Sequence, residues 1–101
     1  MRIFFLSLIT LSIFSCNEKQ PTTQGPINAK DLYTTRCAAC HGMDGKLSIA
    51  GAKPLQTSSL DQAAVVSQIK SGKGSMPPFE GRLSDEEINA VAQFVLTLRT
   101  P

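Results

Sequence analysis

The stretch CAACH, residues 37–41, holds two of the chain's three cysteines and its only histidine. Cys37 and Cys40 are three residues apart, and His41 follows the second cysteine directly. The apolar periodicity before Cys37 predicts that this pair ends a helix, so that two thiols and one imidazole are presented together. Few kinds of protein site use two thiols and an imidazole at this spacing, so the motif limits the kinds of site that the chain can form.

Two thiols at this spacing can each add to one vinyl group of a haem, while the adjacent imidazole binds the iron. A thioredoxin-like redox pair is one alternative, but it would be expected near the start of a helix that follows a strand. Half of a zinc site is another, but His41 is the only histidine and too few ligands remain. The sequence thus predicts one covalent haem c, attached through Cys37 and Cys40 with His41 on the iron.

The first 15 residues have the pattern of a signal peptide. Arg2 precedes twelve residues, 3–14, of which nine are apolar. A membrane-spanning helix needs roughly 20 apolar residues, so this segment is too short for a permanent anchor. Its end, Ser15-Cys16, resembles a bacterial lipoprotein signal, in which the cysteine becomes the lipidated first residue. We expect lipidation at Cys16, with an ordinary secretory leader as the alternative.

Residues 16–27 are predicted to form the lipidated cysteine and a flexible tether, because residues 17–26 contain no apolar side chain. The folded domain is expected over 28–101. Without Arg2 the chain has 9 basic and 8 acidic side chains, a balance that excludes polyanion binding as its main role. So short a domain needs a cofactor, metal or disulfide to complete its core.

Three helical patterns and no alternating strand pattern follow, which predicts an all-α fold. The helices are expected over 28–37, 59–71 and 84–99. The two long connections, 42–58 and 73–83, are rich in glycine and proline, and loops of this length in a small domain usually wrap something.

Local signals set the expected helix ends and faces. Asn28 is a candidate N-cap, Ser59 with Gln62 and Ser84 with Glu87 are candidate capping boxes, and Gly72 is a stop signal. The expected inward stripes are Leu60, Ala63, Val66 and Ile69 for the second helix, and Ile88, Val91, Val95 and Leu98 for the third.

From residue 27 to 99 the chain resembles the class I cytochromes c. The match is ordered: a helix into CAACH, a Gly-rich loop with Pro54-Leu55, a middle helix, a loop with Met76, and a C-terminal helix. The resemblance implies three main helices and two long loops wrapped around one haem. It also implies that the first and last helices cross near Tyr33 and Phe94.

The same resemblance suggests roles for residues around the ring. It implies that the Pro54 carbonyl accepts from the second ring N–H of His41. It implies that Leu55, Phe79 and Leu83 pack on the haem, although each side chain could equally be ordinary core.

Met76 is the expected sixth ligand of the iron. A thioether favours reduced iron, and Gly72 and Gly74 before it and Pro77-Pro78 after it suit a tight, stiff ligand loop. Met76 could instead fill a gap in the core. Met43 is a rival ligand, but two residues from His41 it stays on the proximal side.

With both iron faces closed, the expected function is one-electron transfer between redox proteins, not catalysis. We expect a monomer, lipid-anchored on the periplasmic side of a bacterial membrane. The alternatives are a small haem peroxidase or gas-reactive haem protein with an open sixth position, or a fixed redox subunit of an oxidase or dehydrogenase. A basic rim could steer an acidic partner, or the same lysines could be scattered and solvated: Lys46, Lys53, Lys70 and Lys73.

Overall fold

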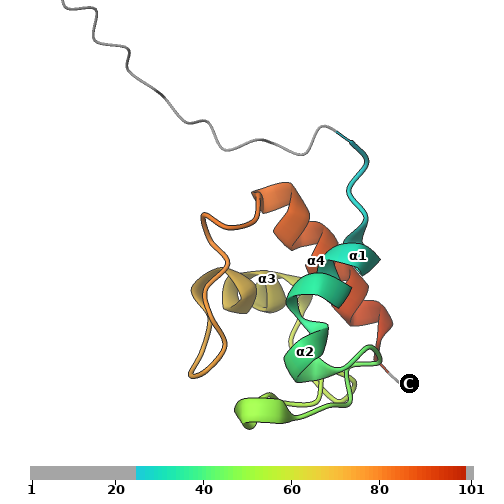
Figure 1. The fold of residues 1–101 in the computed structure, drawn as a ribbon, viewed down its shortest axis with the longest axis vertical. Helices are drawn as coiled ribbons and strands as arrows, with labels where there is room; N and C mark the ends of the chain where they lie inside the picture. Colours follow the sequence, from blue (N-terminus) through green and yellow to red (C-terminus); the bar gives the residue numbers. More distant parts are fainter. Residues whose placement is uncertain (1–24, 100–101) are drawn as a thin grey trace, which may run out of the picture.

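The computed structural model describes residues 25–99, which fold around four helices and one 3₁₀ turn (Figure 1). Within these residues the β pairing is limited to two isolated bridges, so the all-α prediction is confirmed. The expected signal peptide, Cys16 and most of the expected tether lie outside the described residues. In chain order the elements are α1 (Ala29–Arg36), α2 (Ala38–His41), η1 (Ile49–Gly51), α3 (Gln62–Ser71) and α4 (Asp85–Thr97).

The first and last helices begin where their capping signals predict. The Asp31 amide donates to Asn28 Oδ1 at 3.1 Å, which satisfies one of the free N–H groups at the start of α1. Before α4, the Glu87 amide donates to Ser84 Oγ at 3.1 Å, and the Ser84 amide donates to Glu87 Oε1 at 3.0 Å. Both predicted caps are confirmed, including the reciprocal capping box.

The predicted start of α3 at Ser59 is wrong. The N-cap is Asp61, whose Oδ1 accepts from the Ala64 amide at 2.8 Å. A carboxylate satisfies this amide and also interacts favourably with the positive end of the helix dipole, so it makes a better cap than the serine hydroxyl. The predicted stop is confirmed, because Gly72 ends the helix with φ 67°.

The predicted inward face of α3 is also partly wrong. Val65 and Ile69 are the buried side chains, whereas Leu60 and Ala63 are exposed. Val65 and Ile69 are four residues apart on one face, and burying these two large side chains removes more apolar surface than burying Ala63. Val66 is half-buried at the edge of that face.

Helix α4 is the centre of the fold, with α1 and α3 both packed against it (Figure 1). At the crossing of α1 and α4 the rings of Tyr33 and Phe94 lie 5.1 Å apart at 51°, which confirms the predicted crossing. Tilted rings at this separation are a favourable aromatic pair. The buried core is formed by Tyr33, Val65, Ile69, Phe79, Leu83, Ile88, Val91, Ala92 and Val95.

The CAACH segment and the loop with Met76 lie on two different pairs of helices. Helix α2 packs on α1 and on η1, whereas α3 packs on α4, and α2 and α3 do not pack on each other. The CAACH segment therefore belongs to the pair α1 and α2, whereas the loop with Met76 connects α3 to α4. Their relative position depends on the crossing of α1 with α4.

Candidate haem site

The CAACH segment lies at a break between two helices. Cys37 ends α1, where its amide donates to the Tyr33 carbonyl at 2.9 Å, and the same residue begins α2, because its carbonyl accepts from the His41 amide at 3.0 Å. One helical turn thus separates Cys37 from His41. Cys37 is half-buried, Cys40 is exposed, and both are free thiols. The prediction that the pair ends a helix is confirmed for Cys37 alone, because Cys40 lies in the short helix α2 that follows.

The environment of Cys37 differs from that of a disulfide-exchange cysteine. Burial raises the pKa of its thiol to about 11, so the thiol is protonated at neutral pH. Reactive exchange cysteines have a lowered pKa, because the thiolate is the nucleophile. The shift at Cys37 is thus opposite to the one that activates an exchange cysteine.

The His41 imidazole has a buried nitrogen that makes no hydrogen bond. Nδ1 is inaccessible to solvent and has no partner within the described residues. Burial lowers the pKa of His41, and the nearby Lys53 carbonyl opposes this effect. The imidazole is thus neutral near pH 7, which is the form that binds a metal.

The backbone oxygen beside His41 is that of Lys53, one residue before the expected Pro54, whose side chain is exposed. A metal-binding imidazole needs a partner for its second nitrogen, and the Lys53 carbonyl is the backbone oxygen that acts on this ring. The sequence singled out Lys53 only for its charge and not for its carbonyl, because any residue of the loop can offer a carbonyl.

Met76 lies in a closed four-residue turn after α3. The Lys73 amide donates to the Met76 carbonyl at 3.1 Å, and the Met76 amide donates to the Lys73 carbonyl at 3.0 Å. The Met76 side chain is half-buried against the core cluster. Met43, by contrast, is 56% exposed. Of the two candidate methionines, only Met76 packs against the core cluster and lies in this hydrogen-bonded turn.

The three apolar residues expected around the ring are not equivalent. Phe79 and Leu83 are buried in the core with α3 and α4. Leu55 is half-buried, and its amide donates to the Gly45 carbonyl at 2.8 Å, which closes the loop after CAACH.

The four lysines of the suggested basic rim are also not equivalent. Lys70 Nζ lies 2.9 Å from Asp85 Oδ1, which ties the end of α3 to the start of α4. The Asp85 carboxylate raises the pKa of Lys70. Lys46, Lys53 and Lys73 have exposed side chains on the two loops. Of the four lysines, only these three could form the suggested basic rim with a charge that is not already paired to Asp85.

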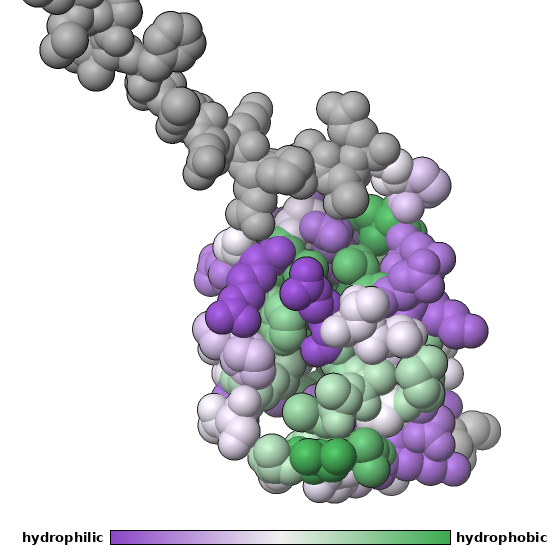
Figure 2. Space-filling view, in the orientation of Figure 1, coloured by the Kyte–Doolittle hydropathy of each residue, from purple (hydrophilic) through white to green (hydrophobic). Residues whose placement is uncertain are grey.

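Apolar side chains are exposed on the loop that follows CAACH. Figure 2 shows a hydrophobic area along the lower edge of the molecule, where η1 lies in Figure 1. Met43, Leu47 and Ile49 of this loop are between 42% and 56% exposed. This loop thus exposes three large apolar side chains to solvent.

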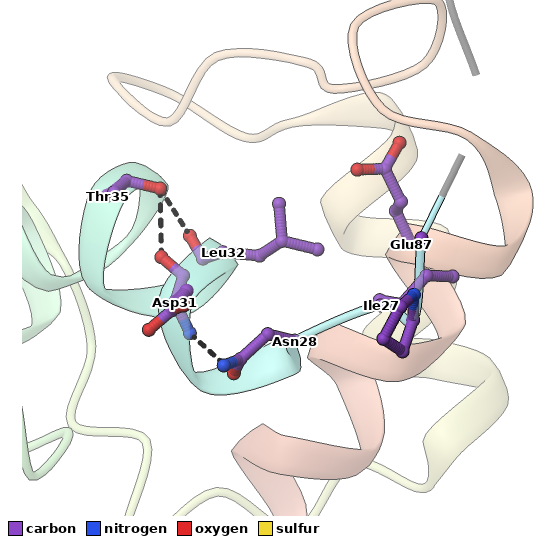
Figure 3. A pocket seen from close by; sticks show the side chains of 8 residues that line it. Ile27, Asn28, Asp31, Leu32, Thr35 and Glu87 are labelled. Atoms are coloured by element: carbon purple, nitrogen blue, oxygen red, sulfur yellow. Dashed lines mark hydrogen bonds between the residues drawn. The ribbon is translucent and has the colours of Figure 1, made fainter. Parts of the chain in front are cut away.

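A separate open hollow of about 250 Å³ lies at the N-terminal end of α1 (Figure 3). It contains none of the residues expected to hold a haem. Its lining includes Ile27, Asn28, Asp31, Leu32, Thr35 and Glu87.

Two further observations concern residues 25–99 alone. No helix in this range combines the length and the apolar character required to cross a membrane. No three His, Cys, Asp or Glu side chains in this range gather as a site for a bare metal ion. The donor set near α2 instead suits a haem iron, for which the macrocycle supplies most of the ligands and the protein supplies the axial ones. The neutral His41 imidazole and the thiols of Cys37 and Cys40, gathered on one short helix, fit that group.

The fold and this donor set define a small c-type cytochrome. Residues 26–95 match the family model described as "Cytochrome C oxidase, cbb3-type, subunit III", and the chain belongs to this family of cytochrome c domains. It is 36% identical to cytochrome c6 of Gracilaria tenuistipitata var. liui over 95% of this chain and 94% of that one. It is 44% identical to cytochrome c6 of Leptolyngbya boryana over 64% of this chain and 82% of that one.

Solved structures agree with the fold. The KustC0563 c-type cytochrome superposes with a TM-score of 0.68 at 26% identity, over 73% of this chain and 100% of that one. Cytochrome c6 of the diatom Phaeodactylum tricornutum superposes with a TM-score of 0.59 at 38% identity, over 72% and 93%. The protein is a small electron carrier, not an enzyme, and its cofactor is one covalent haem c.

Proposed function

We propose that this protein carries single electrons between redox proteins at the periplasmic face of a bacterial membrane, to which a lipid on Cys16 attaches it. Cys37 and Cys40 form the thioether bonds, and His41 and Met76 bind the iron from opposite faces. The haem supplies an iron that cycles between ferrous and ferric states. The observation that carries the proposal is the closed turn that holds Met76 at the end of α3, while Met43 is largely exposed.

The ligand pair determines what the chain can do. Neutral His41 and the Met76 thioether leave no site on the iron for peroxide or a gas, so the chemistry is limited to electron transfer. Two protein ligands also keep the coordination number the same in both oxidation states, so little rearrangement accompanies each transfer. A neutral sulfur ligand favours the ferrous state and raises the potential relative to two imidazoles.

Substitution of Met76 tests this assignment. The wild-type protein should have a low-spin haem with a sulfur-to-iron charge-transfer band when oxidised, and its reduced form should not bind carbon monoxide. Met76→Ala should lose the band, lower the potential and bind carbon monoxide, because the sixth position opens. Met43→Leu is the matched control and should change none of these properties. A wild-type protein that binds carbon monoxide as readily as Met76→Ala does would contradict the electron-carrier assignment.

A shuttle and a fixed subunit differ in how the carrier is held. The description of the matching family names an oxidase subunit, which makes a fixed subunit the second candidate. Relatives matched over more than nine tenths of their own length are named cytochrome c6, which favours a separate carrier. After mild detergent extraction, a shuttle should run alone on size exclusion at moderate salt. Stable co-purification with an oxidase or dehydrogenase would show the fixed arrangement instead.

A further inference from the structure

Gly72 is in unusually close contact with the segment that contains Met76. A Cβ atom built on Gly72 would lie 2.5 Å from the Met76 carbonyl oxygen, 2.8 Å from the Pro77 carbonyl carbon and 2.8 Å from the Pro78 nitrogen. All three atoms belong to the backbone, and two belong to prolines, whose φ is fixed by the ring. The segment therefore cannot yield by a change of side-chain rotamer.

The segment is also held against α3 from its far end. The Phe79 amide donates to the Ile69 carbonyl at 3.0 Å, and the Glu80 amide donates to the Lys70 carbonyl at 3.2 Å. Phe79 is itself buried in the core, 6% exposed. The chain thus leaves α3 at Gly72, makes the closed turn with Met76, and returns to the last turn of the same helix.

We propose that Gly72 is a positioning residue for the Met76 thioether. Because it has no side chain, the backbone of residues 76–78 can lie directly on the end of α3, and this contact sets the distance of Met76 from the rest of the fold. Its φ of 67° and ψ of 175° are a combination that is essentially confined to glycine. The inference rests on the proposed role of Met76 as the sixth ligand.

Two other glycines of the same loop provide controls. Gly74 and Gly81 have φ values of 58° and 81°, so alanine at either position is also strained. No atom lies within 4 Å of a Cβ built on either one. Gly74→Ala and Gly81→Ala therefore add backbone strain to the loop without pushing residues 76–78 away from α3.

The test compares holoproteins by the charge-transfer band of the oxidised form, the midpoint potential, and carbon monoxide binding to the reduced form. Gly72→Ala should weaken ligation by Met76 at least about tenfold, as loss of a residue that orients a metal ligand commonly does. The band should fade, the potential should drop, and carbon monoxide should bind. Gly74→Ala and Gly81→Ala should keep the band and exclude carbon monoxide, even where they lower the unfolding midpoint.

A double-mutant cycle separates positioning from general stability. In the Met76→Ala background, Gly72→Ala should leave the potential and carbon monoxide binding unchanged, because no ligand remains to be positioned. Equal bands in Gly72→Ala and Gly74→Ala, with Met76 ligation intact in the wild type, would overturn the inference and leave the proposed function standing. A wild type without the band would overturn both.

If Gly72→Ala does not accumulate as holoprotein, a second pair of variants makes the same test. Pro78→Ala frees the φ angle of a residue that lies over Gly72, so the segment in Gly72→Ala/Pro78→Ala can move back and the chain can fold. This double variant should lose the charge-transfer band that Pro78→Ala alone retains. Equal bands in the two would overturn the positioning role.

Discussion

The Tyr33 hydroxyl donates a hydrogen bond to the Gly42 carbonyl oxygen across 2.6 Å. Tyr33 is completely buried, and its ring packs on Phe94 at the crossing of α1 and α4. Gly42 directly follows His41 and ends α2. The Tyr33 side chain thus connects the crossing of α1 and α4 with the segment that presents the His41 imidazole.

Tyr33→Phe should test this connection with little change in packing. The variant keeps the ring on Phe94 and leaves the Gly42 carbonyl with only the Gly45 amide as a donor, at 3.2 Å, so we expect a loss of about 1 kcal/mol in the free energy of unfolding. Denaturant titration of the holoprotein measures it. Thr34→Val removes an exposed hydroxyl that donates to the Lys30 carbonyl and should change stability by less than about 0.5 kcal/mol. Equal effects of the two variants would contradict a special role of Tyr33.

The raised pKa of Tyr33 predicts that the protein loses stability at alkaline pH. Burial raises the pKa of Tyr33 to about 12 from the ordinary value of 10.0, and the nearby Asp44 carboxylate adds to this effect. The unfolded chain releases this proton near pH 10, whereas the folded chain retains it, so the contribution of Tyr33 is lost as the pH rises from 10 to about 12. Unfolding midpoints of wild type and Tyr33→Phe should converge over this range. A constant difference would contradict the prediction.

Removal of both thioether cysteines should remove the cofactor and most of the fold. In Cys37→Ala/Cys40→Ala we expect no haem stain after denaturing electrophoresis, because no covalent bond survives denaturation. We also expect largely unfolded circular dichroism, since a domain of this size depends on the ring for much of its core. Met43→Leu should retain both the stain and the helical spectrum. Extraction of haem from the wild type by acid and organic solvent would contradict the covalent attachment.

Mass spectrometry of the mature protein should identify Cys16 as its lipidated first residue. Cys16→Ala should move the protein from the membrane fraction to the soluble fraction, because the anchor is lost. Multiple acylation is expected, since one acyl chain binds a membrane only weakly. Ser15→Ala keeps a small residue before the cysteine and should remain anchored. A Cys16→Ala protein that is processed normally and stays with the membrane would contradict lipidation.

Ala50 in η1 offers a stabilising substitution. Its φ of 54° and ψ of 35° are left-handed, and its Cβ opposes that conformation. Ala50→Gly should therefore raise the free energy of unfolding by about 1 kcal/mol. Ala52, with φ −57° and ψ 134°, is the matched control, and Ala52→Gly should lower stability because it only adds freedom to the unfolded chain. Thermal unfolding of both holoproteins measures the difference.

The sequence by itself determined the class of fold, the attachment motif and three of the helix boundaries. These features depend on neighbours a few residues apart, as in CAACH, the Asn28 cap, and the Ser84 and Glu87 box. The aromatic crossing of Tyr33 with Phe94 was also predictable, but from the family resemblance and not from any local pattern.

Only the tertiary structure decided which of several plausible local signals applied. The predicted cap of α3 was Ser59, whereas the structure uses Asp61, and packing on α4 selects the face with Val65. The sequence marked Gly72 as a helix stop, but its contact with Met76, Pro77 and Pro78 arises because Phe79 and Glu80 return to the same helix. The hydrogen bond from Tyr33 to the Gly42 carbonyl likewise depends on the change of chain direction between α1 and α2 at Cys37. Local patterns specify where helices begin and end, whereas close packing of distant backbone decides which side chains fit between them.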